Sequence, residues 1–287
     1  MTRPNVQNLY PNVYLDIVKT LNLSDRITEY ENELNKKIDR FLAADLSTTR
    51  ERKETKRIFD SFYSAIMSAQ NRSWTKHRAK VAKVLRRDPY KYLQLTKALS
   101  RNGFYRFCDH YEIGRWVDRY TNIRTIAEYL IELDRVHRGS RRYFRDIYRT
   151  NGLQGLLNSV IENTRLPGIG KATARNSLRD VFGLDLVKPD AVLQRVFRNL
   201  GWVTENETNP DVYQRVCEEI SIHRAGVVDH VFWIFGNANG RPKWNIHKQY
   251  CSGTMEKSYT DCKQAEPCFC KSHCQSINKA LYLSPKV

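Results

Sequence analysis

Apolar side chains recur every three or four residues along most of this chain, which is the spacing that places them on one face of an α-helix. No alternation of apolar and polar residues persists long enough to indicate a β-strand, so we expect an all-α fold. The pattern predicts helices over residues 58–70, 75–85, 90–98, 115–120, 123–133, 141–149, 153–162, 171–182, 191–200, 211–223 and 227–236.

Polar stretches and turn dipeptides separate these helices. Residues 1–55 are mostly helical in pattern, and the charged stretch 47–56 is interpreted as a connection to the next part of the chain. Three dipeptides are turn signals that separate the helices, namely Asp88-Pro89, Asn102-Gly103 and Asn151-Gly152.

Two glycines in the segment LPGIGKATA, residues 166–174, predict a tight turn that leads into a helix. Glycine has no Cβ atom, so Gly168 and Gly170 can adopt positive φ and let another backbone approach closely. An apolar stripe over 153–161 predicts a helix before the turn, and helical spacing resumes from Lys171. The unit is a helix, a short glycine hairpin and a second helix, whose N-terminal N–H groups suit a phosphate.

Asp190, at the end of the segment VKPD, is the second notable feature. It precedes apolar residues whose spacing is typical of a helix buried on one face. Aspartate is favoured as the capping residue at a helix start, which is one interpretation of this position. The other interpretation is a carboxylate that acts on the sugar or base of a nucleotide whose phosphate the glycine turn holds.

Together these features resemble the helix-hairpin-helix superfamily of DNA glycosylases, of which endonuclease III is a familiar member. The family pattern is L-P-G-[VI]-G-x-x-T-A, then an apolar helix, then an Asp at fixed distance; residues 166–174 match it, and Asp190 falls at the catalytic position. The resemblance implies an endonuclease III-like fold of two helical domains, with the DNA-facing cleft between them. A six-helix domain with the hairpin would span 56–184, and the second domain would combine 1–55 with 185–287, including a C-terminal cysteine cluster.

The resemblance also implies roles for single residues. Asp190 would be catalytic, and the segment FYSAIMSAQ would end in Gln70, which in that family enters the space left by an extruded base. An ordinary exposed glutamine at a helix end is the alternative for Gln70. The hairpin residues expected to bind DNA phosphate are Gly168, Gly170, Lys171 and Thr173.

Three departures from the family pattern sharpen the expected activity. Bifunctional members carry a Lys two residues after the second hairpin glycine, where this chain has Ala172, so the resemblance implies a monofunctional enzyme that uses water. It would hydrolyse the N-glycosidic bond of a damaged, mismatched or modified base in double-stranded DNA and leave an abasic site. Ile66 replaces the Glu of adenine-specific members, and Ala191-Val192 replaces the Thr-His that often follows the Asp.

The charge of the chain points to a polyanionic partner. Lys and Arg outnumber Asp and Glu by 48 to 31, which gives a formal net charge of +17 and favours DNA. Hydrophobic residues make up 41%, which indicates a folded protein rather than a basic tail. Five arginines would share one basic face of a continuous helix, although Gly139 would interrupt it: Arg135, Arg138, Arg142, Arg145 and Arg149. We assign Arg142 and Arg145 to DNA contact, with a merely solvated face as the alternative.

Four aromatic residues are candidates for stacking on an extruded base, with a place in the core as the alternative for each: Tyr63, Trp74, Trp116 and Tyr143. The N-terminal residues lack the basic start and apolar core of a signal peptide, and no apolar run approaches the ~18 residues of a membrane span. We therefore expect no membrane partner and an intracellular monomer, in the cytoplasm or nucleoid of a prokaryote or the nucleus of a eukaryote.

Five of the seven cysteines lie within residues 251–274, with the spacing C-x10-C-x5-C-x-C-x3-C. In an intracellular protein such a cluster indicates a metal site more than disulfides. Related glycosylases hold a [4Fe–4S] cluster with C-x6-C-x2-C-x5-C, so the resemblance extends to the location and number but not to the spacing. We expect the cluster on Cys251, Cys262, Cys268 and Cys274, with Cys270 as the alternate; structural zinc, with His247 or His273 replacing a thiolate, is the competing interpretation.

Two other functions remain open at this point. A helix-hairpin-helix element can serve only to bind phosphate, which would make the protein a DNA-binding module without catalysis. A lyase that cuts abasic DNA through another amine, such as Lys171, is the third possibility. The pattern leaves undetermined which base a glycosylase would remove.

Overall fold

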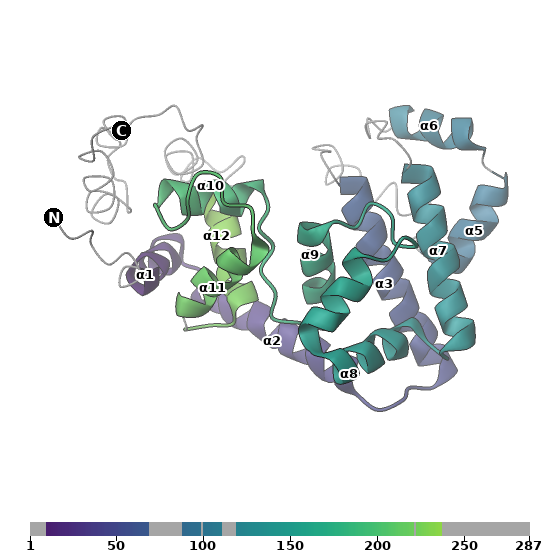
Figure 1. Cartoon of the computed structure of the whole chain (residues 1–287), viewed down its shortest axis with the longest axis horizontal. Helices are drawn as coiled ribbons and strands as arrows, with labels where there is room; N and C mark the ends of the chain where they lie inside the picture. The colour runs from purple at the N-terminus through teal and green to yellow at the C-terminus, as the bar shows by residue number, and fades with distance from the viewer. Residues whose placement is uncertain (1–9, 69–87, 99, 111–118, 221, 237–287) are drawn as a thin grey trace. The chain divides into compact units, whose positions relative to one another are not determined.

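The computed structural model describes residues 10–68, 88–98, 100–110, 119–220 and 222–236, and every regular element in these ranges is an α-helix (Figure 1). The expected all-α class is therefore confirmed. The helices are α1 (Tyr10–Leu21), α2 (Ser24–Leu42), α3 (Thr48–Ser68), α5 (Pro89–Ala98), α6 (Arg101–His110), α7 (Arg119–Val136), α8 (Ser140–Ile161), α9 (Lys171–Phe182), α10 (Ala191–Asn199), α11 (Pro210–Ile220) and α12 (Ala225–Gly236).

The chain divides into two compact units. The central unit is Lys36–Gly183, and the split unit combines Met1–Asn35 with Leu184–Val287. The first boundary thus falls inside α2, at Lys36 rather than at residue 56. The reason is that residues 40–51 bond to side chains of α8, so they belong with the helices of the central unit.

In the central unit α3 is the helix on which α7, α8 and α9 all pack, and α5 packs on α7 (Figure 1). Its apolar face recurs at helical spacing, so Phe59, Phe62 and Ile66 are all buried. Phe144 of α8 and Phe182 of α9 complete this core, with ring centroids 5.9 Å apart.

The stretch 47–56 is not a connection, as its polarity suggested, because α3 already begins at Thr48. Three of its polar residues, Glu51, Glu54 and Thr55, are buried, while the others are exposed. Glu51 is 3% exposed and bonds to Arg141, and Thr55 is fully buried and donates to Asp134. We predicted helices from the spacing of apolar residues, and this helix start has no such spacing because its buried residues are polar.

The two glycine dipeptides gave opposite outcomes. Gly152 has φ 67° and ψ −169°, so α8 is kinked there, as the turn signal predicted. Gly103 instead lies in the first turn of α6, where its N–H donates to Oγ of Ser100 at 3.1 Å. A serine that satisfies an N–H group at the helix start lets the helix include the Asn102-Gly103 dipeptide.

The split unit has its own core, formed by α1, the first part of α2, and α10 to α12. Phe197 lies at its centre, with its ring 5.2 Å from Trp202, 5.2 Å from Phe232 and 5.8 Å from Tyr213. No helix in the described ranges combines the length and the apolar character that crossing a membrane requires.

Candidate nucleic-acid interface

The glycine turn joins α8 to α9 in the central unit and is anchored by two buried apolar side chains. Leu166 is 2% exposed and Ile169 is 3% exposed. The N–H of Ile169 donates to the carbonyl of Leu166 at 3.2 Å and closes the turn. Gly168 and Gly170 are both exposed. The turn therefore presents its glycine backbone to solvent while its apolar residues hold it on the core.

Gly168 and Gly170 differ in whether the fold itself requires a glycine at that position. Gly168 has φ 81°, which L side chains rarely adopt, and a Cβ atom there would lie 3.0 Å from Nδ2 of Asn122. Gly170 has φ −82°, and a Cβ atom there would meet nothing within 4 Å. The fold therefore needs a glycine only at position 168. At position 170 a side chain would obstruct only a molecule that approaches from outside.

Helix α9 begins directly after this turn with an uncapped N-terminus. Gly170 is the N-cap residue, and no side chain there accepts from the first-turn N–H groups. Lys171 is exposed and Thr173 is half-buried in the same turn. The start of α9 therefore offers free N–H groups, the positive end of the helix dipole and a lysine, all of which favour the binding of an anion. The structure thus brings together the four hairpin residues expected to hold phosphate.

Asp190 lies in the split unit and is the N-cap residue of α10. Its Oδ1 atom accepts from the N–H of Val192 at 2.9 Å and from the N–H of Leu193 at 3.1 Å. Its Oδ2 atom lies 3.4 Å from Nζ of Lys188, and the side chain is 20% exposed. The capping interpretation is therefore correct for one carboxylate oxygen, while the second oxygen is adjacent to a cation.

The extended segment before Asp190 is fixed by side chains of α11 and α12. Oε1 of Gln214 accepts from the N–H of Val187 at 2.8 Å. The buried carboxylate of Asp229 accepts from the N–H of Lys188 at 2.9 Å. Sequence reasoning missed both Gln214 and Asp229, because they follow much later in the chain and no spacing relates them to Asp190.

Arg195, in the second turn of α10, adds charge near the carboxylate. Its Nε atom is buried without a hydrogen-bond partner in the described part of the chain. Burial lowers the pKa of the Arg195 guanidinium, and the charge of Asp190 opposes that lowering. Asp190 therefore has two neighbouring cations, Lys188 and Arg195, which attract its negative charge.

Three arginines of α8, at intervals of four, bond to the C-terminal end of α2; we call Arg141, Arg145 and Arg149 the arginine clamp. Arg141 is fully buried, pairs with Glu51 at 2.6 Å, and donates to the carbonyls of residues 40, 41, 43 and 44. Arg145 donates to the carbonyl of residue 43 at 2.8 Å, and Arg149 to that of residue 42 at 2.8 Å. The last carbonyls of a helix have no partner within it, so the clamp completes α2.

The single basic face expected for five arginines is therefore absent. Helix α7 ends at Val136 and α8 begins at Ser140, so Arg135 and Arg138 do not share a helix with the others. Arg145 is 4% exposed and also pairs with Asp45 at 2.8 Å, which leaves it a structural role rather than the expected DNA contact. Arg142 is half-buried and pairs with the other oxygen of Asp45 at 2.7 Å.

Several predicted site residues lie outside the described ranges. These are Gln70, Trp74, Trp116 and the cysteines Cys251, Cys262, Cys268, Cys270 and Cys274. The described residues contain no cluster of His, Cys, Asp and Glu that could hold a metal. Of the other aromatic candidates, Tyr63 is fully buried between Phe59 and Tyr92, so it is a core residue rather than a platform for a base.

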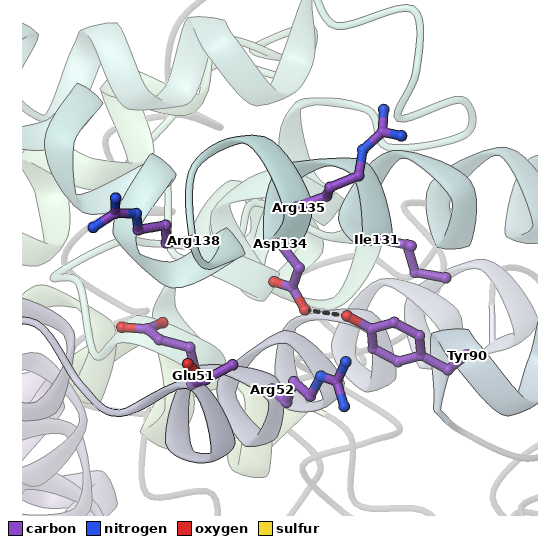
Figure 2. A pocket seen from close by; sticks show the side chains of 8 residues that line it. Glu51, Arg52, Tyr90, Ile131, Asp134, Arg135 and Arg138 are labelled. Atoms are coloured by element: carbon purple, nitrogen blue, oxygen red, sulfur yellow. Dashed lines mark hydrogen bonds between the residues drawn. The ribbon is translucent and has the colours of Figure 1, made fainter.

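A pocket of about 580 Å³ opens elsewhere in the central unit, and sequence reasoning did not identify it (Figure 2). Its lining comes from helices that are far apart in the chain. Figure 2 shows the hydrogen bond that the hydroxyl of Tyr90 donates to Asp134 among the lining residues; its length is 2.6 Å. The lining residues are Thr48, Glu51, Arg52, Tyr90, Ile131, Asp134, Arg135 and Arg138.

Comparison with protein-family models, with curated proteins and with solved structures finds no significant match to this chain.

Proposed function

We propose that this protein is a monofunctional DNA glycosylase of the helix-hairpin-helix type, which hydrolyses the N-glycosidic bond of an altered base in double-stranded DNA. The observation that carries the proposal is the exposed, uncapped glycine turn at the start of α9, combined with the carboxylate of Asp190 at the start of α10. Gly170 is consistent with this, because it leaves the space in front of the helix start open to a ligand. The two units would be the two domains of an endonuclease III-like fold.

Each group has a distinct task in this mechanism. The N–H groups at the start of α9 and the charge of Lys171 hold a phosphate of the damaged strand. The base leaves the stack at a cost of a few kcal/mol, and Gln70 fills the space it leaves. As the glycosidic bond stretches, positive charge develops on the sugar, and Asp190 stabilises it.

Asp190 can activate water through only one of its oxygens. Oδ1 is already engaged by two backbone N–H groups, so Oδ2 is the atom that would orient or deprotonate the attacking water. Lys188 lies 3.4 Å from Oδ2 and would hold the carboxylate in place. Ala172 provides no amine in the hairpin, so water remains the nucleophile and the product is an abasic site.

The cysteine-rich segment completes the proposal. A [4Fe–4S] cluster on Cys251, Cys262, Cys268 and Cys274, with Cys270 as the alternate ligand, would fold a tail that has few apolar residues of its own. Structural zinc is the competing proposal. Iron and acid-labile sulfide analysis of the purified protein separates the two.

The decisive experiment measures base release from a panel of duplexes, each with one altered base, by wild type and Asp190→Asn. Asparagine is as good an N-cap residue as aspartate, so this variant keeps α10 capped and removes only the charge. We expect a loss in rate on the order of 10²- to 10⁴-fold, with wild-type strands cut only after alkali treatment. Asp25→Asn, at an exposed first-turn position of α2, is the matched control and should keep full activity.

A non-enzymatic binding module is the first rival, because capping α10 by itself explains an aspartate at this position. If no duplex releases a base and Asp190→Asn binds DNA more tightly than wild type, the module is the correct function. The tighter binding would follow from removing a negative charge near phosphate.

An abasic-site lyase is the second rival, and the structure changes which amine it would use. Lys188 lies beside the candidate catalytic carboxylate, with its Nζ atom 3.4 Å from Oδ2 of Asp190, whereas Lys171 has no ion-pair partner in the described residues. The amine would attack the aldehyde carbon of the abasic sugar and expel water to form an imine. Borohydride reduction would then trap a covalent DNA adduct in wild type but not in Lys188→Gln. Our proposal predicts no adduct with either protein.

A further inference from the structure

The pocket in Figure 2 lies at the far end of the helices that support the glycine turn. The turn packs on Ile66, near the end of α3, and on Asn122, near the start of α7. The pocket is lined by Arg52, near the start of α3, and by Asp134, near the end of α7. About 14 residues of helix separate Arg52 from Ile66, which is about 20 Å. The pocket is therefore a separate place on the central unit.

The carboxylates of the pocket already have partners inside the protein. Glu51 pairs with Arg141, which lies behind it, at 2.6 Å. Asp134 accepts from the hydroxyl of Tyr90 at 2.6 Å, from the N–H of Ser140 at 2.9 Å, and from the hydroxyl of Thr55. Their donor bonds fix both carboxylates in the wall, so neither reaches out to neutralise an arginine of the rim.

Two of the arginines of the rim have no such partners. Arg135 and Arg138 are exposed, and neither side chain forms an ion pair with any described residue. Arg52 lies over the ring of Tyr90, 5.3 Å from its centroid, which positions its guanidinium without neutralising it. With Glu51 matched by Arg141, three guanidinium groups face one carboxylate, so the pocket has a positive excess.

The backbone at Arg138 is unusual for an arginine. Its φ is 60°, in the left-handed region that favours glycine and asparagine. The following residue is Gly139, so this turn could have been built with glycines alone. Strained backbone that holds a particular side chain is found preferentially at binding sites. The position of Arg138 is therefore independent support for a role of its side chain.

We propose that this pocket binds a small phosphorylated molecule with more than one negative charge. Its volume of about 580 Å³ is in the range of small-molecule sites. Figure 2 shows Arg135 and Arg138 extending to opposite sides of Asp134, so a ligand that contacts both has anionic groups at separate points. Thr48, the first residue of α3, adds the positive end of a helix dipole. Tyr90 and Ile131 provide surface for the uncharged part of the ligand.

The test is calorimetric titration of the full-length protein with ATP, pyrophosphate and inorganic phosphate, with adenosine as the uncharged control. We expect ATP or pyrophosphate to bind, adenosine not to bind, and Arg135→Gln/Arg138→Gln to weaken binding at least ~10-fold. Arg106→Gln, which removes an exposed arginine of α6 outside the pocket, should bind as wild type does. Both substituted arginines are exposed, so the double variant should unfold at the wild-type temperature.

Measurements of duplex binding by the same variants distinguish this pocket from the proposed DNA interface. Lys171→Gln should weaken binding of a plain duplex and leave ATP binding unchanged, while the double variant should do the reverse. If the double variant weakens duplex binding instead, these two arginines contact nucleic acid and the small-molecule proposal is wrong. The absence of binding by all three phosphate probes also overturns it. Neither result bears on base release, so the glycosylase proposal stands or falls separately.

Discussion

Two sets of three arginines on the central unit have opposite environments. The arginine clamp of α8 is bonded to main-chain carbonyls at the end of α2, and Arg141 among them is fully buried. The pocket arginines, Arg52, Arg135 and Arg138, are exposed and border a cavity. Residue type is the same in both sets, and two of the pocket arginines lie in the stretch that leads directly into α8.

The two sets of arginines differ in how many hydrogen-bond acceptors lie close to them. A guanidinium has five N–H donors and no acceptor, so it can be buried only where many oxygens converge. The end of α2 provides such oxygens, because the last carbonyls of a helix have no partner within it. Within the described residues, no such set of carbonyl oxygens bonds to the pocket arginines. A cluster of arginines therefore indicates a binding site only after its neighbours have been examined.

The largest expected effect comes from breaking the clamp. Arg141→Met removes the partner of buried Glu51 and leaves several carbonyls unbonded, so we expect a loss of about 3–5 kcal/mol in the free energy of unfolding. Urea denaturation followed by circular dichroism measures it. Arg141→Met/Glu51→Met should lose less than the single variant, because no uncompensated charge remains buried. A single variant as stable as wild type would show that the clamp does not hold α2.

We expect a much smaller change in the free energy of unfolding from a substitution among the pocket arginines. Arg138→Gly removes a guanidinium but relieves the positive φ, at the expense of a more flexible unfolded chain. These terms oppose each other, so the free energy of unfolding should stay within about 1 kcal/mol of wild type in the same urea experiment. A loss as large as that of Arg141→Met would place Arg138 among the structural arginines and remove the contrast.

The smallest effect concerns acid stability at the exposed edge of the clamp. The hydrogen bond from Arg145 holds the pKa of Asp45 below its ordinary value of 3.8. The carboxylate therefore contributes stability that is present above about pH 4 and is lost as the pH falls through the lowered pKa. Asp45→Asn should unfold at a lower temperature than wild type at pH 7, and the two melting temperatures should converge as the pH falls below the lowered pKa of Asp45. Equal differences above and below that pKa would contradict this account.

In the candidate site, too, some features depend on residues that are adjacent in the chain and others depend on how distant helices pack. The glycine turn and the helix after it were predictable, because a positive φ and a helix start depend on residues that are adjacent in the chain. The capping interpretation of Asp190 was predictable for the same reason. The contacts of Gln214 and Asp229 with the segment before Asp190 were not, since they depend on how α11 and α12 pack.

The sequence by itself determined the all-α class, the kink at Gly152, the glycine turn and the capped start of α10, all of which follow from local backbone preferences and apolar spacing. Only the tertiary structure decided that α3 begins at Thr48, that Arg145 supports α2, and that Arg52, Tyr90 and Asp134 line one pocket. The physical reason is that a polar side chain has no periodicity to reveal its place. Whether it is buried or exposed depends on the donors and acceptors that other parts of the chain bring to it.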